Sequence, residues 1–436
     1  MTLHPNIIKL TKVNSIIKKK KSQQALLSEE INFMVDGYTS ENIMDDIMSD
    51  WIKAIYDNGM NKDEILSYTK AMLFSGITLD FSYLDGYVID KHSTGGVGDK
   101  VSLILGPILA ACGYHVPMIA GRGLEYTGGT IDKLESIPGY NAFLSIENFK
   151  KNVEKIGISI MSQTDDICPA DKKIYELRDR TKMVASFPLI CGSIMSKKIA
   201  EGIEGLILDI KVGNGAFMKE ISDGKKLGTL LKSVGELYGI KVYPCYTNMD
   251  QPLGDYAGLW CEVLESIECL KGNGPEDLMN VIYYLIEKAF YLSGINFNLD
   301  EIKGIINDGS ALNKFFDMVI AHGGLIKTFE DSKINAPLYK EKIFSIDTGF
   351  ISFMDTELIG LVLSDLCGRH GNSTNALDPS AGIKFHKKNG NYVDKDDLVM
   401  EYFCSNKSNF DNCKYRLQKS FHVQSEHIFK KELIYK

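Results

Sequence analysis

The chain has 436 residues, of which 44% are hydrophobic and 24% charged, with a net charge of −8 at neutral pH. This size allows a substantial buried core and two or three domains. The acidic balance argues against a protein built to bind nucleic acid or an anionic membrane. No early apolar run is long enough for a signal peptide or a membrane span. Nine scattered cysteines without metal-ligand spacing indicate reduced thiols, and hence a cytoplasmic protein without a metal centre.

The first 80 residues have a helical pattern. Ser28 followed by two glutamates is typical of a helix start, because the first turn favours negative charge. Apolar residues then recur at helical spacing, and the segments 43–54 and 64–74 repeat this pattern. The region predicts several helices and no strand.

Strands and helices alternate from residue 87 onward. Residues 101–112 predict an apolar helix, and GLILDIKV (205–212) is typical of a strand buried in a parallel sheet. The five predicted strands are 87–89, 116–120, 158–161, 205–212 and 241–246. The alternation predicts an α/β domain with a mostly parallel central sheet.

A purely helical insertion separates the third and fourth strands, and we expect it to join the N-terminal helices. From residue 343 the pattern changes to that of a smaller α+β subdomain, in which Asn389-Gly390 within 382–393 predicts a β-hairpin. The predicted domains are a discontinuous all-helical domain (1–80 and 169–201), a larger α/β domain (85–165 and 204–340) and the C-terminal α+β subdomain (343–436).

The stretch KHSTGGVGDKVS (91–102) combines glycines, hydroxyl groups and lysines. It lacks both the Gly-Lys-Ser/Thr of a nucleoside triphosphate loop and the third glycine of a dinucleotide fingerprint. Glycines let main-chain N–H groups turn toward an anion. Lys91 adds charge, and Ser93, Thr94 and Ser102 add hydroxyl donors. An ordinary strand-to-helix loop explains this stretch equally well when it is taken alone.

A second glycine-rich loop, AGRGLEYTGGTIDKLES (120–136), also follows a strand and precedes a helix. Loops at the carboxyl ends of adjacent parallel strands meet over one crevice, where open α/β sheets bind ligands. Thr130 adds a hydroxyl group, and the helix that begins near Val101 directs the positive end of its dipole to the same place. The two loops together predict a site for a free phosphate dianion.

The helical insertion carries a third set of polar residues. In PADKKIYELRDRT (169–181), Asp171, Tyr175 and Arg178 share one helix face, and Ser193 and Lys197 lie one turn apart in GSIMSKKIAEG. A guanidinium, a hydroxyl and an ammonium suit a flat heterocycle with carbonyl and imide edges. A solvated charged helix face is the alternative interpretation, since such faces are common.

These motifs resemble those of the pyrimidine-nucleoside phosphorylases, which include thymidine phosphorylase. The similarity comprises KHSTGGVGD, GRGL with TGGTIDKLESIPG, GSIMSKKIAEG, DIKVGNGAFMK and NMDQPLG, and it extends from about residue 26 to about residue 393. It implies phosphorolysis of thymidine, uridine or deoxyuridine to the free base and a sugar 1-phosphate. It also implies an active site in the cleft between a helical and an α/β domain, and homodimers formed through the helical domain.

The resemblance assigns roles to individual residues. The implied phosphate ligands are Lys91, Ser93, Ser102 and Thr130. The implied base-binding residues are His92, Arg178, Ser193 and Lys197, with Leu124, Tyr175, Val184, Ile190 and Phe217 packed around the base. Three of these are predicted to be catalytic, since His92 would protonate a base carbonyl oxygen while Arg178 and Lys197 stabilise the departing negative charge.

Four positions depart from the family pattern. Ala120 replaces a serine, and Glu125 and Tyr126 stand where the family has GLGHTGG. Lys100 stands where some bacterial relatives have a threonine that helps to bind potassium, so we expect its ammonium to replace that ion and to pair with Glu125. We therefore expect no cofactor, with phosphate as co-substrate.

The departures leave two alternative functions open. One is a non-catalytic nucleoside-binding homologue. The other is a phosphoribosyltransferase of the same broad fold, although no acidic pair follows the fifth strand to hold a metal-bound pyrophosphate.

Overall fold

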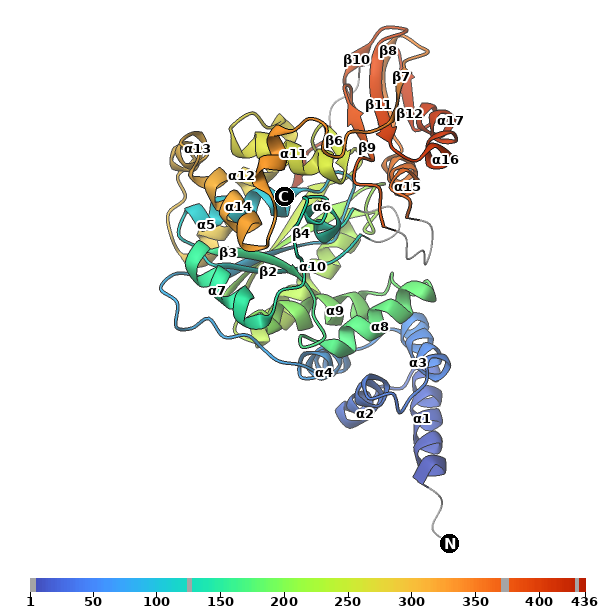
Figure 1. The fold of residues 1–436 in the computed structure, drawn as a ribbon. Helices are drawn as coiled ribbons and strands as arrows, with labels where there is room; N and C mark the ends of the chain where they lie inside the picture. Colours follow the sequence, from blue (N-terminus) through green and yellow to red (C-terminus); the bar gives the residue numbers. More distant parts are fainter. Residues whose placement is uncertain (1–4, 124–127, 370–375, 428–430) are drawn as a thin grey trace. The chain divides into compact units, whose positions relative to one another are not determined.

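The computed structural model describes residues 5–123, 128–369, 376–427 and 431–436 (Figure 1). The chain divides into two compact units. Unit 1 comprises Met1–Tyr83, Gln163–Ile203 and Thr229–Ile240. Unit 2 comprises Leu84–Ser162, Glu204–Gly228 and Lys241–Lys436.

Unit 1 is helical, as the sequence predicts. Its main helices are α1 (Pro5–Lys21), α2 (Ser28–Thr39), α3 (Asp45–Asn58), α4 (Lys62–Leu73), α8 (Pro169–Arg180) and α9 (Phe187–Ala200) (Figure 1). Helix α4 begins where the Asn61 side chain accepts the N–H of Glu64 at 2.9 Å. Trp51, Tyr68 and Leu189 are buried in a core shared by the N-terminal helices and the insertion.

Unit 2 contains the predicted parallel sheet. Strands β1 (Ile89–Ser93), β4 (Gly205–Val212) and β5 (Lys241–Asn248) pair in parallel, and β13 (Ile434–Tyr435) adds an antiparallel edge. Strands β2 (Val116–Ala120) and β3 (Ile158–Ser162) form a second parallel pair, which an isolated bridge between Val88 and His115 connects to β1. All five predicted strands are confirmed. The first begins at Ile89 rather than at Tyr87 and continues through Ser93, so part of the first glycine-rich stretch is strand.

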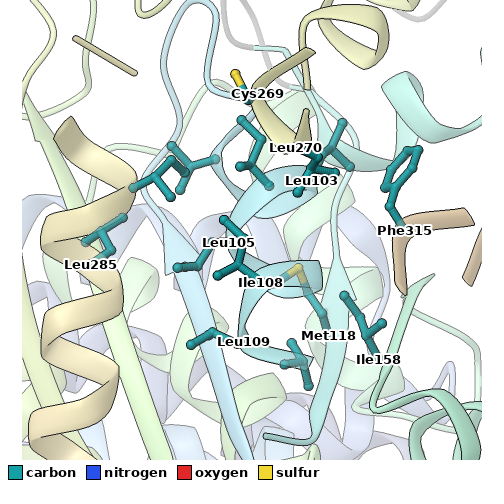
Figure 2. Close-up of a cluster of buried hydrophobic side chains, with 14 of the residues drawn as sticks. Leu103, Leu105, Ile108, Leu109, Met118, Ile158, Cys269, Leu270, Leu285 and Phe315 are labelled. Atoms are coloured by element: carbon teal, nitrogen blue, oxygen red, sulfur yellow. The ribbon is translucent and has the colours of Figure 1, made fainter. Parts of the chain in front are cut away.

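The apolar helix predicted after β1 is α5 (Val101–Ala111), and it lies in the main core of unit 2. Figure 2 shows its side chains Leu105, Ile108 and Leu109 near Met118 of β2 and Leu285 of α12 (Glu276–Ser293). This packing fixes the helix that follows the first loop. Further elements of unit 2 are α6 (Thr130–Leu134), α7 (Ile146–Ile156), α10 (Ile221–Leu237, which continues into unit 1), α11 (Trp260–Leu270), α13 (Leu299–Asn307), α14 (Ser310–Ala321) and a 3-10 helix (Ile326–Glu330).

The described residues between 339 and 424, called the C-terminal segment below, form short helices and, together with β6, two antiparallel sheets. One sheet has the order β6 (Tyr256–Gly258), β9 (Gly382–Phe385), β11 (Leu398–Cys404) and β7 (Tyr339–Phe344). The other has the order β10 (Tyr392–Val393), β8 (Gly349–Met354) and β12 (Phe421–Gln424). The helices are α15 (Thr356–Leu366), α16 (Lys407–Phe410) and α17 (Cys413–Gln418). The segment has its own buried core, which includes Ile351, Val362 and Tyr402.

The predicted hairpin over 382–393 is wrong. Strand β9 pairs with β6 and β11, whereas β10 pairs with β8, so the two arms belong to different sheets. The turn itself is present, because Gly390 has a φ of 81° and its N–H donates to Ile351 O at 2.8 Å. The local turn signal was right, but each arm pairs with a strand far away in the sequence.

Among the residues that the structure describes, none of the helices is both long enough and apolar enough to cross a membrane. Over the same residues, no cluster of three or more His, Cys, Asp or Glu side chains is arranged to hold a metal ion.

Candidate active site

Lys91 and Ser93 lie on the same face of β1, because alternate residues of a strand share a face. The Lys91 side chain is buried, with its Nζ 3.7 Å from Asp209 Oδ2 and 3.8 Å from Asp99 Oδ1. Both distances exceed a normal hydrogen bond. Within the described residues this Nζ has no hydrogen-bond partner. The buried ammonium therefore retains its N–H donors for a ligand.

Asp99, in the first glycine-rich loop, orients this group of side chains. Ser93 Oγ donates to Asp99 Oδ2 at 2.5 Å. Burial alone would raise the pKa of Asp99, but the charges of Lys211, Lys91 and Lys133 and the bond from Ser93 hold it well below its usual range. The carboxylate is therefore ionised and fixes the Ser93 hydroxyl.

Two charged residues of β4 complete the cluster. Lys211 Nζ lies 2.7 Å from Asp209 Oδ2, and Asp209 Oδ1 accepts the Thr247 hydroxyl at 2.6 Å. Thr94 Oγ1 accepts the N–H of Lys211 at 2.9 Å, which joins the first loop to β4. Since Lys211 balances Asp209, the charge of Lys91 is balanced chiefly by Asp99. The motifs alone indicate no role for Asp99, Asp209 or Lys211, although two charges within the apolar run GLILDIKV are a signal for buried ion pairs.

The other predicted ligands in unit 2 occupy the ends of elements. Ser102 lies in the first turn of α5 and is buried. His92 is half-buried and lies on the β1 face opposite Lys91 and Ser93. Thr130 is the first residue of α6, and Phe217 is half-buried after β4. Leu124, Glu125 and Tyr126 lie outside the described residues.

In unit 1, Arg178 donates hydrogen bonds to three main-chain carbonyl groups. Its guanidinium is buried and donates to Val184 O at 2.7 Å, Leu189 O at 3.0 Å and Met183 O at 3.3 Å. Three of its five N–H groups are thereby engaged. Arg178 thus fixes the link between α8 and α9, which carries the half-buried Val184, and two N–H groups remain for a ligand.

Lys197 on α9 is held by two side chains. Its Nζ donates to the buried carboxylate of Asp171 and to Ser193 Oγ, the latter at 3.1 Å. The Tyr175 ring lies 5.9 Å from Lys197 Nζ and 5.7 Å from the Arg178 guanidinium carbon. The predicted base-binding residues Arg178, Ser193, Lys197 and Tyr175 are therefore grouped on α8 and α9, whereas Ile190 is half-buried in the first turn of α9. Helical spacing predicts Asp171 on this face but indicates no role for it.

Lys100 is fully buried in unit 2 and surrounded by oxygen atoms. Its Nζ lies 2.6 Å from Glu265 Oε2 and donates to Leu253 O and Tyr256 O, each at 2.9 Å. Burial alone would lower the pKa of Lys100, but the Glu265 and Glu262 carboxylates raise it above its usual value. All three N–H groups are engaged by described residues. Glu125, the partner expected from the sequence, lies outside the described residues.

The chain matches three domain families in known proteins, two of them domains of one glycosyl transferase family. Residues 14–76 match the helical bundle domain of the glycosyl transferase family, residues 85–312 match its a/b domain, and residues 350–424 match the pyrimidine nucleoside phosphorylase C-terminal domain. The pyrimidine-nucleoside phosphorylase of Geobacillus stearothermophilus is 38% identical over 425 residues, covering 96% of this chain and 98% of the relative. The chain belongs to the pyrimidine-nucleoside phosphorylase family. This confirms the resemblance found in the sequence.

Other members of the pyrimidine-nucleoside phosphorylase family have similar identities. The thymidine phosphorylase of Colwellia psychrerythraea is 41% identical over 379 residues, covering 84% of this chain and 86% of the relative. Among solved structures, the anthranilate phosphoribosyltransferase of Thermus thermophilus matches with a TM-score of 0.54 and 15% identity, covering 70% of this chain and 99% of that protein. The latter similarity shows a shared fold alone.

Proposed function

We propose that this protein catalyses the phosphorolysis of pyrimidine nucleosides, with thymidine, uridine and deoxyuridine as the candidate substrates. The observation that carries the proposal is the buried Lys91 ammonium, which has no hydrogen-bond partner among the described residues and shares a strand face with Ser93. Oxygen atoms of inorganic phosphate would accept from Lys91, Ser93, Ser102 and Thr130. The named activities of the relatives support this reading.

The proposed reaction needs two kinds of help from the protein. A phosphate oxygen attacks C1′ of the sugar, the glycosidic bond breaks, and the base leaves with the bonding electron pair. Lys197 and the two remaining N–H groups of Arg178 would stabilise the negative charge on the base, and Ser193 would help to orient it. His92 would donate a proton to a carbonyl oxygen of the base. The products are the free base and a sugar 1-phosphate.

The test incubates the protein with each of the three nucleosides, with and without phosphate, and measures base release. Release that requires phosphate supports the proposal. Tight nucleoside binding without release would instead indicate a non-catalytic homologue. Transfer of the phosphoribosyl group from phosphoribosyl pyrophosphate to the base, with release of pyrophosphate in the presence of magnesium, would indicate a phosphoribosyltransferase.

We also propose that the reaction is independent of potassium. A potassium ion prefers a set of oxygen ligands, and the carboxylate and two carbonyl groups around Lys100 form such a set. The residues present do not fit an added ion there, because the Lys100 ammonium already engages all three groups. Wild-type rates should therefore be the same in potassium and in a bulky inert cation at equal ionic strength.

Two further proposals rest on the sequence analysis. We propose that the protein acts in the cytoplasm and forms a homodimer through the helical domain. Leu27 and Met44, at helix starts in unit 1, are 56% and 71% exposed, so their apolar side chains are accessible to a second copy of the chain. Sedimentation of the wild type and of a Met44→Glu variant tests the association, since a monomeric wild type would refute it.

A further inference from the structure

The two ends of the second glycine-rich loop, residues 121–123 after β2 and residues 129–131 at the start of α6, lie against each other. These two ends are called the loop neck below. A methyl group added at Gly129 would lie 2.1 Å from Gly123 N and 2.4 Å from Arg122 C, so only glycine permits this approach. The N–H of Ile131 donates to Gly121 O at 3.3 Å across the same neck. The two ends of the loop therefore touch main chain to main chain, directly before Thr130.

The Asp132 side chain is buried beside this neck. Its Oδ2 accepts the N–H of Gly123 at 2.8 Å, and its Oδ1 accepts from Arg122 Nη1 at 3.1 Å. Arg122 is half-exposed and also binds Glu135, with Nη1 to Oε2 at 2.5 Å. A buried carboxylate needs a cation that is itself firmly held. Arg122 meets this need only in part, since it shares its guanidinium with a partly exposed partner.

The second cation comes from the C-terminal segment. Arg369 follows α15, and its side chain is 22% exposed. Its Nη2 lies 2.5 Å from Asp132 Oδ2, and its Nη1 donates to Gly123 O at 2.6 Å. One planar guanidinium thus holds both a main-chain carbonyl on one side of the neck and a carboxylate on the other, a geometry that lysine does not reproduce.

The C-terminal segment does not depend on Arg369 for its attachment to the rest of unit 2. Strands β6 and β9 pair over three residues. Lys388 Nζ lies 2.5 Å from Asp277 Oδ2, and the N–H of Thr356 donates to Asn214 Oδ1 at 2.7 Å. Removing the Arg369 guanidinium should therefore free the loop neck while the segment stays in place.

We propose that Arg369 is a positioning residue for phosphate binding, through which the C-terminal segment fixes the loop that carries Thr130. The inference rests on the proposed function, in which Thr130 is a phosphate ligand. It assigns the C-terminal segment a task in the reaction, in addition to its contribution to the core. In the proposed function the base is bound mainly by residues of unit 1, so phosphate and nucleoside affinity should respond differently to the loss of Arg369.

The test compares Arg369→Gln with a matched control, Arg416→Gln, which removes a second arginine–carboxylate pair of the same segment, that with Asp365. We expect Arg369→Gln to raise the KM for phosphate about tenfold, the effect of losing one charge-assisted interaction. The KM for nucleoside should stay near the wild-type value, whereas the melting temperature should fall, because the buried Asp132 loses one of its two cations. Arg416→Gln should leave both KM values unchanged. Equal phosphate KM values in the two variants would overturn the proposal.

Two further measurements separate positioning from general damage. If Arg369 acts through Thr130, the phosphate defect of Thr130→Val should not add to that of Arg369→Gln. Hydrogen exchange at Gly123 and at residues 128–134 should accelerate in Arg369→Gln and not in Arg416→Gln. This second readout needs no turnover. If the wild type releases no base, the proposed function fails, and unchanged exchange in Arg369→Gln would still refute the positioning role by itself.

Discussion

Replacing Lys100 by alanine tests whether the protein carries its own internal cation. The substitution leaves the buried Glu265 carboxylate without its ammonium partner, and it removes the donor from Leu253 O and Tyr256 O. The Glu265 carboxylate still accepts hydrogen bonds from the main-chain N–H groups of Asp255 at 2.7 Å and Tyr256 at 3.2 Å, and these bonds reduce the loss of stability. Breaking one side of a buried ion pair costs about 3 to 5 kcal/mol. We expect a clearly lower melting temperature together with weaker phosphate binding.

The pH dependence of this loss has a defined sign. Burial already raises the pKa of Glu265 in the wild type, and removal of the Lys100 charge would raise it further. A carboxyl whose folded pKa lies above its unfolded value contributes stability at low pH and loses it as the pH rises through the folded pKa. The difference between wild type and Lys100→Ala should therefore be small in mild acid and grow toward neutral pH.

The effect of potassium on the melting temperature of the variant is the decisive measurement. In Lys100→Ala, potassium or ammonium ions can enter the space beside the three oxygen atoms, and a ligand at 100 times its Kd stabilises the folded state by about 2.7 kcal/mol. The melting temperature of the variant should rise with potassium but not with a bulky cation, while the wild type responds to neither. The control Lys271→Ala removes an exposed pair with Glu268 and should change stability by less than about 1 kcal/mol. A wild type whose rate requires potassium would refute the reasoning.

Three shorter predictions address other charges. Lys91→Met should raise the KM for phosphate by about 10- to 100-fold in steady-state assays, because it removes a charge-assisted donor, and an unchanged KM would exclude Lys91 as a ligand. Asp171→Asn should lower kcat by at least about tenfold through Lys197, without a change in phosphate KM; a change in phosphate KM alone would contradict this. Burial lowers the pKa of His322 to about 4, so between pH 6.5 and 4 the unfolded chain binds a proton that the folded chain does not. Unfolding experiments should show stability falling by about 3 kcal/mol over that range in the wild type but not in His322→Gln, and equal slopes would refute it.

The elements of the fold follow from local patterns, and for that reason the sequence predicts them well. The run GLILDIKV is apolar apart from two charged residues, and all eight residues of β4 are buried. The hairpin failed because strand pairing is not local. Tyr392 pairs with Phe350 rather than with the other arm of its own turn. A turn signal reports where the chain reverses and carries no information on which strand becomes the neighbour.

The site shows the same limit at the level of single residues. The motifs identify Lys91, Ser93 and Lys197 as candidates because their residue types suit phosphate and a pyrimidine. They contain Asp99 and Asp171 but do not indicate that these carboxylates hold the neighbouring cations and hydroxyl groups. Asp209 and Lys211 could be expected to have ionic partners, since charges in a buried strand must be compensated. The pairing of Lys100 with Glu265 required the fold, because no sequence spacing connects the first loop to α11.

Helix α11 explains why a buried lysine lies in or directly after each glycine-rich loop. Glu262 and Glu265 lie three residues apart, and so on one helix face. Glu265 holds Lys100 of the first loop at 2.6 Å, and Glu262 holds Lys133 at 2.7 Å in the helix that follows the second loop. Lys133 Nζ also donates to Asp99 O at 2.7 Å, which joins the two loops directly.

Buried ion pairs of this kind add little stability compared with well-packed apolar side chains. Apolar residues at these positions would fill the space, but they would leave the main-chain oxygens of Asp99, Leu253 and Tyr256 without donors. The buried lysines are therefore better explained by the positions in which they hold the two loops than by a gain in stability. One turn of α11 sets the spacing of two loops, and that spacing determines how far Ser93 and Ser102 lie from Thr130. The proposed phosphate dianion, held by all three, would gain from loops whose separation is already fixed before it binds.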